Sequence, residues 1–501
     1  MADILTTIVE RRTEDMKKFG VTFGIDIPEK RQRPVHPFLT EKGVILEVKR
    51  ASPSKGDIAP ELDSAATAKS YAEAGAAAIS CLTENNYFKG TLEDLMKVCA
   101  AVDEYETESG KRAPAVLRKD FIVSADEIEV SYRAGADAVL LIARILDESV
   151  IVEMAKKTAG FGMTSLVEVR SDEDIQKLKA VADAVDKQFI VCGVNSRDLA
   201  TFKIDLLKPC TLLGKIRDVL GADARVIFES GIRTPQAAKF AGSLGFTGML
   251  LGEAAAKAPE LREKLVSSFV EAKPTRNSEF WSKQARHAEL VSASNKKIPK
   301  QVRDDGGRPL IKICGLTFAE DVLYADAIGA EFVGFIFAAG FGRNVYGEKF
   351  EAIKPALKNV KAKKVAVITD IKSPEAAAAA SYVKQGILDC IQLHGISYEE
   401  VPSRFLELPH YFAITEKNGS LEQTAEKLFL MGEPRFLQDS KTQSYDTNHK
   451  LWLAGGVTPE NAAELFSRFH PELIDVSGGV EDETIGIKNH GKMKRIIEVI
   501  K

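Results

Sequence analysis

Short apolar runs alternate with amphipathic segments along the chain, and this alternation constrains the fold more than any other feature. In the first half, eight runs of five to eight residues are each followed by a helical pattern. They span 43–50, 76–83, 115–121, 137–144, 164–169, 189–195, 225–230 and 248–252. Near-continuous apolar runs are typical of parallel strands buried on both faces, and strand–helix alternation implies right-handed crossovers. The pattern predicts an α/β fold of the (β/α)8 barrel type.

The same rhythm restarts after residue 308, with eight more apolar runs. They span 310–315, 332–337, 363–368, 390–395, 409–415, 435–439, 451–456 and 473–479. The segment between the two series is polar and rich in lysine and arginine, which predicts a partly disordered linker whose Phe280 and Trp281 can dock on a barrel. We therefore expect two consecutive TIM barrels joined by a polar linker. The expected domains are 1–272 with an N-terminal helical arm, the linker 273–308, and a second barrel at 309–501.

Composition narrows the range of functions. The chain has 501 residues, of which 45% are hydrophobic and 28% charged, and its formal net charge is −4. Such values are typical of a globular protein and favour neither nucleic acid nor a membrane surface as partner. Six scattered cysteines without a C-x-x-C pair argue against a disulfide framework or a zinc site. The N-terminus lacks the apolar core of a signal peptide, so we expect a cytoplasmic protein. We also expect a monomer that uses no metal or cofactor.

Charged and polar residues stand at the ends of apolar runs in the first half. Glu47 and Lys49 lie on one face of the first run, where they are costly unless paired or used. The other candidates are Lys119, Glu168, Asn195, Arg197, Glu229, Ser230, Gly231 and Gly252. Because the carboxyl ends of barrel strands converge on one mouth, these residues together predict one active site. The alternatives are a salt-bridged edge strand for Glu47 and Lys49, and solvated surface positions for the others.

Six motifs lie in order within residues 1–270: EVKRASPSKG, LTENNYFKGTLEDL, LRKDFIVSADEIEVSYRAGADAVLLIARIL, LVEVRS, GVNSRDL and ESGI. On these motifs the first half resembles indole-3-glycerol-phosphate synthase. The resemblance implies conversion of 1-(2-carboxyphenylamino)-1-deoxyribulose 5-phosphate to indole-3-glycerol phosphate, with release of CO2 and water. It implies Lys119 as general acid and Glu168 as general base. The residues implied to assist them or to bind substrate are Glu47, Lys49, Asn195, Arg197, Glu229 and Ser230.

The chemistry of ring closure agrees with these residue types. Negative charge develops on a carbonyl oxygen, which a positioned ammonium stabilises, and the loss of water needs a base. We expect the phosphate on backbone N–H groups near Gly231 and Gly252, with Ser52 from the loop after the first run. Phe121 and Phe88 offer apolar surface for the anthranilate ring, or else they pack in the core.

Two residues of the second half are placed for acid–base chemistry. Cys314 ends a strand just before a predicted helix start at Thr317 to Glu320, a position that lowers the pKa of a thiol. The alternative is a buried structural cysteine. Asp439 closes the run at 435–439 and suits a general acid, with a helix N-cap as the alternative.

Together with QLHG at 392–395, LAGG at 453–456 and DVSGGVE at 475–481, these two residues resemble phosphoribosylanthranilate isomerase. The resemblance covers about residues 309–501 and implies an Amadori rearrangement of N-(5-phosphoribosyl)anthranilate to the ketose that the first barrel consumes. Asp439 would protonate the furanose ring oxygen, Cys314 would take the C2 proton, and Arg343 would bind the anthranilate carboxylate. The other implied binding residues are His394 and, for the phosphate, Gly455, Gly456, Ser477, Gly478 and Gly479.

Three loops of the second half depart from that family. The usual Ser-Pro-Arg reads Phe341-Gly342-Arg343, and the usual Pro-Gly-x-Lys-Asp reads Ile485-Gly486-Ile487-Lys488-Asn489. The glycine-rich loop expected after the strand that ends at Asp439 is replaced by residues 440–445. One alternative is therefore an active synthase whose second barrel is a non-catalytic stabilising or interaction domain. Another is that both barrels act on other phosphosugars, which would favour a carboxylate in place of Cys314.

Overall fold

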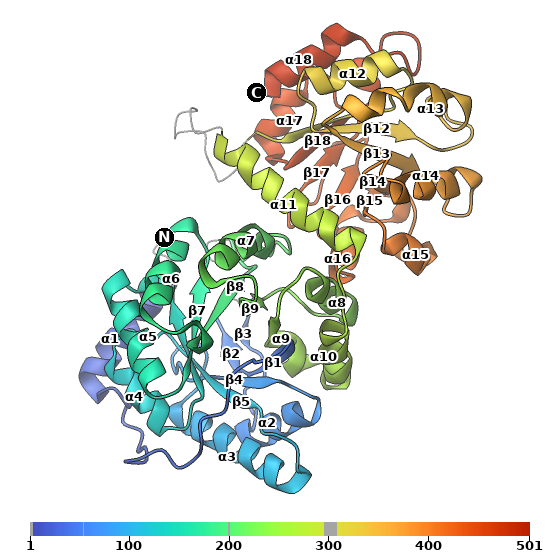
Figure 1. The fold of residues 1–501 in the computed structure, drawn as a ribbon. Helices are drawn as coiled ribbons and strands as arrows, with labels where there is room; N and C mark the ends of the chain where they lie inside the picture. The colour runs from blue at the N-terminus through green and yellow to red at the C-terminus, as the bar shows by residue number, and fades with distance from the viewer. Residues whose placement is uncertain (1–3, 54, 199–200, 295–307, 501) are drawn as a thin grey trace. The chain divides into compact units, whose positions relative to one another are not determined.

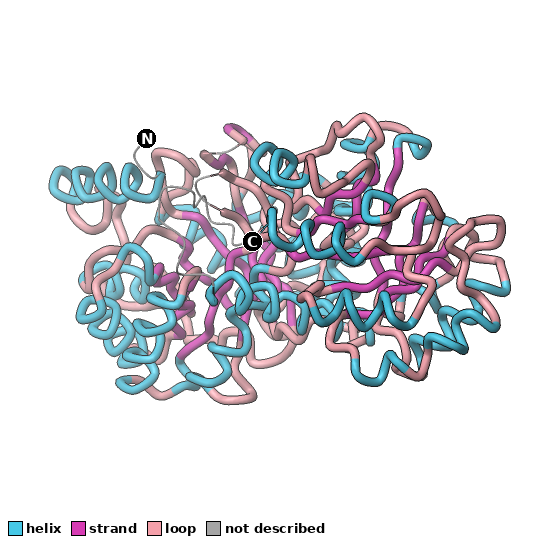
Figure 2. The backbone as a smooth tube through the Cα atoms, turned by 90° about the horizontal axis from the view of Figure 1, so that it is seen from above, coloured by secondary structure: helices cyan, strands magenta, loops and turns pink. Residues whose placement is uncertain are grey.

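The computed structural model describes residues 4–53, 55–198, 201–294 and 308–500, and the chain divides into two compact units, Met1–Pro274 and Thr275–Lys501 (Figure 1). Each unit is a closed barrel of eight parallel strands with helices in the connections. In Figure 2 the strands of each barrel, in magenta, lie inside the helices, in cyan. The predicted fold class is confirmed.

The first barrel contains one strand in each of the eight predicted runs. The strands are β1 (Gly43–Val48), β4 (Ala78–Leu82), β5 (Ala115–Lys119), β6 (Ala138–Ile142), β7 (Thr164–Val169), β8 (Ile190–Asn195), β9 (Val226–Glu229) and β10 (Gly248–Leu251). The barrel closes where β1 pairs with both β4 and β10. Because β1 has a neighbour on either side, the edge-strand alternative for Glu47 and Lys49 is wrong.

The helices of the first unit follow the strands as the sequence predicts. They are α1 (Ile4–Phe19), α2 (Ser64–Glu73), α3 (Leu92–Ser109), α4 (Asp126–Arg133), α5 (Glu148–Gly160), α6 (Asp172–Ala184), α7 (Lys208–Leu220), α8 (Pro235–Ser243), α9 (Glu253–Lys257) and α10 (Arg262–Val270). The loop after β1 carries a two-stranded antiparallel sheet, β2 (Ala51–Ser52) and β3 (Gly56–Asp57). In this way the loop turns back at the mouth of the barrel.

The N-terminal arm begins with α1, which lies across the mouth of the first barrel. Leu5 and Ile8 are buried in the same cluster as the strand side chains of the barrel interior, and they line the cavity at its carboxyl end. Arg12 anchors the helix through an ion pair of 2.7 Å with Asp120 and a second ion pair with Glu127. All three of these charged side chains are buried, and the buried Arg118 contacts the same two carboxylates, so the four charges compensate one another.

The second barrel again has one strand in each predicted run. The strands are β11 (Leu310–Cys314), β12 (Phe332–Ile336), β13 (Lys363–Ile368), β14 (Cys390–His394), β15 (His410–Thr415), β16 (Phe436–Asp439), β17 (Trp452–Ala454) and β18 (Leu473–Val476). The helices are α11 (Arg276–Ser294), α12 (Ala319–Ala327), α13 (Glu348–Ile353), α14 (Pro374–Lys384), α15 (Ser403–Leu406), α16 (Leu421–Leu430), α17 (Ala462–Phe469) and α18 (His490–Ile500). Pairing of β11 with β18 closes the barrel. No helix in the described ranges is long and apolar enough to cross a membrane.

The segment predicted as a linker, 273–308, is largely helical where it is described. Helix α11 belongs to the second unit, and its Trp281 is fully buried with its ring 5.7 Å from that of Trp452. Asn277 fixes the start of the helix by accepting a hydrogen bond from the backbone N–H of His410. The prediction that Trp281 docks on a barrel is confirmed, and Arg276–Ser294 is a helix within the segment predicted as a partly disordered linker. Residues 295–307 lie outside the described part of the chain.

Candidate active sites

The carboxyl ends of the first barrel's strands surround a cavity of about 190 Å³. Every residue predicted for this mouth lines it: Glu47, Lys49, Ser52, Lys119, Phe121, Glu168, Asn195, Arg197, Glu229, Ser230, Gly231 and Gly252. The structure therefore brings together side chains from strands that are far apart in the sequence. Phe88 also lines the cavity, and its ring lies 5.9 Å from that of Phe121, so both aromatic residues face the site.

Glu47 lies between two lysines at the mouth of the first barrel. Its carboxylate is 3.2 Å from Lys49 Nζ and 3.8 Å from Lys119 Nζ, and it accepts a hydrogen bond of 3.3 Å from Ser80. Burial acts to raise the pKa of Glu47, but the two ammonium groups outweigh burial and lower it. Burial also acts to lower the pKa of Lys119, yet Glu47 and the other carboxyl groups raise it. Lys119 is therefore held as an ammonium, the form that donates a proton.

A second carboxyl pair, Glu168 and Glu229, completes the charged part of the mouth. The two side chains are hydrogen bonded, and burial together with the charge of Glu168 raises the pKa of Glu229 to about 8. Burial acts to raise the pKa of Glu168 as well, but Arg170 and Lys119 lower it. Glu168 is thus the carboxylate of the pair, and Glu229 carries the proton. A Cβ at Gly193 would lie 2.1 Å from Glu229 Oε1, so the glycine in β8 leaves room for this carboxyl group.

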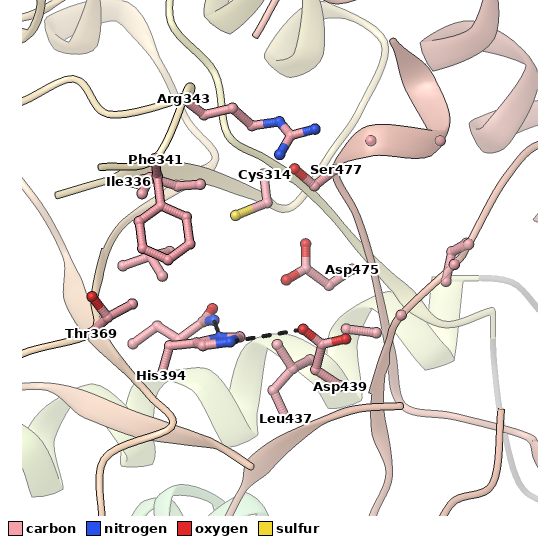
Figure 3. Close-up of a pocket in the computed structure, with 18 of the residues that line it drawn as sticks. Cys314, Ile336, Phe341, Arg343, Thr369, His394, Leu437, Asp439, Asp475 and Ser477 are labelled. Atoms are coloured by element: carbon pink, nitrogen blue, oxygen red, sulfur yellow. Dashed lines mark hydrogen bonds and ion pairs between the residues drawn. The ribbon is translucent and has the colours of Figure 1, made fainter. Parts of the chain in front are cut away.

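The mouth of the second barrel holds a separate cavity of about 470 Å³ (Figure 3). The predicted residues that line it are Cys314, Arg343, His394, Asp439, Gly455, Gly456, Ser477, Gly478 and Gly479. In Figure 3 the Cys314 thiol and the Asp439 carboxylate both extend into the cavity, from β11 and β16. The structure therefore places a candidate base and a candidate acid in one space.

Cys314 does not have the depressed pKa that its place before a helix predicts. Burial raises the pKa of its thiol, and Lys312 only partly opposes this effect. The expected helix start at Thr317 is also wrong: α12 begins at Ala319, and the Thr317 hydroxyl donates to the carbonyl of Gly486 instead. Burial therefore outweighs any stabilisation of the thiolate by the helix N-terminus.

Asp439 faces His394 across the second cavity, with 3.9 Å between Oδ2 and Nε2 (Figure 3). Burial lowers the pKa of His394, although Asp439 opposes the shift. The alternative that Asp439 caps a helix is wrong, because the described chain after β16 runs to β17 without a helix. Asp439 is about one-third exposed, which leaves its carboxylate open to a ligand.

Two family models match the chain in the order of its two barrels. Indole-3-glycerol phosphate synthase matches residues 23–267, and N-(5'phosphoribosyl)anthranilate (PRA) isomerase matches residues 311–499. The indole-3-glycerol phosphate synthase of Exiguobacterium sibiricum is 34% identical over 274 residues, which cover 54% of this chain and 96% of that protein. The chain belongs to the indole-3-glycerol phosphate synthase family.

Two further relatives match both barrels. The tryptophan biosynthesis protein TRP1 of Phytophthora nicotianae is 28% identical, with 86% of each chain covered. The multifunctional tryptophan biosynthesis protein of Phycomyces blakesleeanus is 30% identical over 91% of this chain, which spans 62% of that relative's length. The chain is a bifunctional enzyme of tryptophan biosynthesis, with a synthase barrel followed by an isomerase barrel.

Arg170 is a residue of the synthase barrel that the sequence interpretation missed. Its guanidinium lies 2.8 Å from Glu168 Oε1 and donates a hydrogen bond of 3.0 Å to the carbonyl of Arg197. It therefore fixes both the carboxylate and the loop after β8. The signal was available, because Arg170 follows Glu168 by two residues, just as Lys49 follows Glu47.

The isomerase barrel contains a buried polar network that was also missed. Lys312 is fully buried in β11, 2.7 Å from Asp475, and it donates to Gln392, which also accepts from Tyr411. Burial raises the pKa of Asp475, and the Lys312 ammonium partly opposes this shift. The network lies below Cys314, because Lys312 precedes it by two residues on the same face of β11.

Arg343 is held by an acidic residue of another loop. Its Nε and Nη2 atoms lie 2.7 and 2.6 Å from the two carboxylate oxygens of Glu481. Glu481 in turn accepts a hydrogen bond of 2.7 Å from Lys488, whose ammonium is buried. This bidentate pair orients the guanidinium at the edge of the second cavity.

Proposed function

We propose that the isomerase barrel converts N-(5-phosphoribosyl)anthranilate to 1-(2-carboxyphenylamino)-1-deoxyribulose 5-phosphate. The synthase barrel then converts this ketose to indole-3-glycerol phosphate, CO2 and water. The proposal rests on the side chains that line the cavity at the mouth of each barrel. One holds Lys119 and the carboxylate of Glu168 around one cavity, and the other holds Cys314 and Asp439.

In the synthase barrel, ring closure forms a bond between the anthranilate carbon that bears the carboxylate and the ketone carbon of the sugar. The Lys119 ammonium gives a proton to the ketone oxygen, so that negative charge does not accumulate there. The carboxylate then leaves as CO2, which restores the aromatic ring. Glu168 takes the proton from the carbon next to nitrogen, and the new hydroxyl leaves as water with a proton taken up from solvent. Glu47 holds Lys119 in its charged form, and Lys49 in turn pairs with Glu47.

The phosphate of the ketose is bound at the synthase mouth by the segments that follow β1, β9 and β10. Ser52 offers a hydroxyl, and Gly231 and Gly252 offer backbone that a phosphate can approach closely. Arg197 and Arg233 line the same cavity and supply positive charge. Asn195 accepts a hydrogen bond from the backbone N–H of Arg197, which fixes the loop that carries this arginine.

In the isomerase barrel, Asp439 donates a proton to the furanose ring oxygen, and the bond from that oxygen to C1 breaks. The product is a protonated Schiff base. Cys314 as thiolate then removes the proton from C2, and the resulting enolamine becomes the ketose by tautomerisation. The cationic Schiff base next to the sulfur favours the thiolate and so counters the effect of burial on the pKa of Cys314.

Selective inactivation tests this division of labour. The purified chain is assayed with each substrate, as parent and as Lys119→Ala and Cys314→Ala variants. We expect the first variant to lose the synthase activity alone and the second to lose the isomerase activity alone. A Cys314→Ala variant that isomerises as fast as the parent would exclude the thiol as the base, and a parent chain without isomerase activity would favour a non-catalytic second barrel.

A cytoplasmic location and a monomeric state are further parts of the proposal. None of the six cysteines, which all lie in the described ranges, forms a disulfide, and this is typical of a reducing compartment such as the cytoplasm. Size-exclusion chromatography with light scattering should give the mass of one chain. A mass of two chains would contradict the monomer.

A further inference from the structure

Two loops meet over the mouth of the isomerase barrel. One follows β12 and includes residues 338–347, and the other follows β18 and includes residues 481–489. Their contacts are the bidentate pair of Arg343 with Glu481 and the packing of Ile485 against Gly342. A Cβ at Gly342 would lie only 3.0 Å from a methyl group of Ile485, so the glycine permits this close approach.

Phe341 occupies an unusual position in the first of these loops. Its side chain is 52% exposed, and yet it lines the cavity that holds Cys314. Figure 3 shows the Phe341 ring extending into this cavity near Ile336 and Thr369, with the Cys314 sulfur close by. An aromatic ring left this exposed at the wall of a cavity gains free energy when an apolar group of a ligand covers it.

The neighbours of Phe341 give the shape of the group that would cover it. Ile336 and Val367 continue an apolar wall along the cavity. Arg343, two residues later in the same loop, lines the same cavity. An apolar wall beside a cation fits a planar aromatic ring that carries a carboxylate.

We infer that Phe341 is a specificity residue of the isomerase barrel, stacking on the aryl ring of the substrate while Arg343 takes its carboxylate. The inference rests on the isomerase function proposed above. Phe341 stands where the family that the sequence resembles usually has serine, so this contact is a feature of the present chain. Ile485 acts on the same subsite as a positioning residue, because it packs against the backbone next to Phe341.

The test compares ligands with and without an aromatic ring. Inhibition constants are measured in the isomerase assay for the reduced product, 1-(2-carboxyphenylamino)-1-deoxyribitol 5-phosphate, and for ribulose 5-phosphate. For Phe341→Ala we expect the first constant and the KM to rise about tenfold, the size of effect that a lost aromatic contact gives. The constant for ribulose 5-phosphate should not change.

Phe318 provides a matched control, because it is also 52% exposed in a loop of the same barrel but does not line the cavity. Phe318→Ala should leave both constants and the KM at the parent values. An unchanged constant for the aryl ligand in Phe341→Ala would overturn the inference. So would an equal weakening of both ligands, which would indicate a structural defect of the loop.

Calorimetric titration of the full chain with the reduced product separates this inference from the proposed function. The parent should show binding at each of the two barrels, and Phe341→Ala should weaken one of them. If the parent bound the reduced product in this way but had no isomerase activity, the proposed function would fail and the subsite would stand. If the parent isomerised but Phe341→Ala bound like the parent, only the subsite would fail.

Discussion

Glu168 and Glu229 form a hydrogen bond between two buried carboxyl groups, one of which keeps its proton to about pH 8. The asymmetry has a structural cause. Arg170 contacts Glu168 directly and stabilises its charge, whereas Glu229 Oε1 has no hydrogen-bond partner in the described part of the chain. A base and a proton donor therefore lie side by side at the mouth of the synthase barrel.

Neutralising Glu229 should change the pH dependence of the synthase. If the protonated form of Glu229 supports Glu168, parent kcat/KM should fall above about pH 8 as Glu229 ionises. Glu229→Gln mimics the neutral carboxyl, so its profile should lack this decline. In contrast, Glu168→Gln removes the base and should reduce kcat by about 10²–10⁴-fold at every pH. A Glu229→Gln profile that declines like the parent would contradict the assignment.

The same substitution should affect stability in a pH-dependent way. The pKa of Glu229 is raised by folding from its ordinary value of 4.5 to about 8. The folded state therefore loses stability relative to the unfolded state as pH rises between these values. Glu229→Gln should lack this loss. Its free energy of unfolding in urea should therefore exceed that of the parent by more at pH 9 than at pH 5. An equal difference in the free energy of unfolding at both pH values would show that packing, not ionisation, causes the difference.

The isomerase should be sensitive to the acidity of the residue at position 314. Because burial raises the pKa of Cys314, kcat/KM should rise with pH through the neutral range as the thiolate fraction grows. Cys314→Ser replaces the thiol by a far weaker acid and should lose at least about 100-fold in rate. Synthase activity, measured on the same sample, is the control for folding. A Cys314→Ser variant with near-parent isomerase activity would rule out the thiol as base.

Gly315 should be required for the position of Arg343. It has φ of +73°, and a Cβ there would lie 2.5 Å from Arg343 Cδ and 2.9 Å from Ser477 Oγ. Gly315→Ala should therefore raise the isomerase KM by displacing both residues. Gly347→Ala is the matched control, because Gly347 has φ of +88° and open space around it. Both variants carry backbone strain of about 1–3 kcal/mol, but only the first should change the KM.

Trp281 should stabilise the second unit although it lies outside the region predicted as a barrel. Its fully buried ring packs against Phe280 and Trp452. Trp281→Ala should destabilise this unit by about 3–5 kcal/mol, the usual effect of removing a buried aromatic side chain. Thermal unfolding followed by loss of isomerase activity measures the effect, with the exposed Phe318→Ala as control. A loss below about 1 kcal/mol would show that α11 is not part of the folded unit.

The strands and most site residues were predictable because their signals are local or periodic. All sixteen barrel strands lie in apolar runs, and residues at the ends of parallel strands must meet at one mouth. The capping boxes at the starts of α3 and α6 are also local signals, since Thr91 and Ser171 are each followed three residues later by an aspartate. A local signal fails where a distant partner intervenes. Thr317 does not cap α12, because its hydroxyl donates to the carbonyl of Gly486, which is far away in the sequence.

Properties that depend on three-dimensional surroundings were not predictable in this way. The pKa of Cys314 is decided by its burial, which the sequence pattern does not quantify. Lys312 looks like an interruption of an apolar strand until Asp475, 163 residues away in the chain, is placed beside it. Helix α11 is polar along much of its length, so its pattern indicates a linker. Only the contact with Trp452 shows that it is part of the second unit.

That contact decides how the two enzymes can be separated. A fragment starting at residue 309 would expose the ring of Trp452 and remove the partner that Asn277 gives to the backbone of His410. A fragment starting at Thr275 would keep both contacts. The gene is therefore best divided between codons 274 and 275, ahead of α11, although the polar composition of this helix is that of a linker.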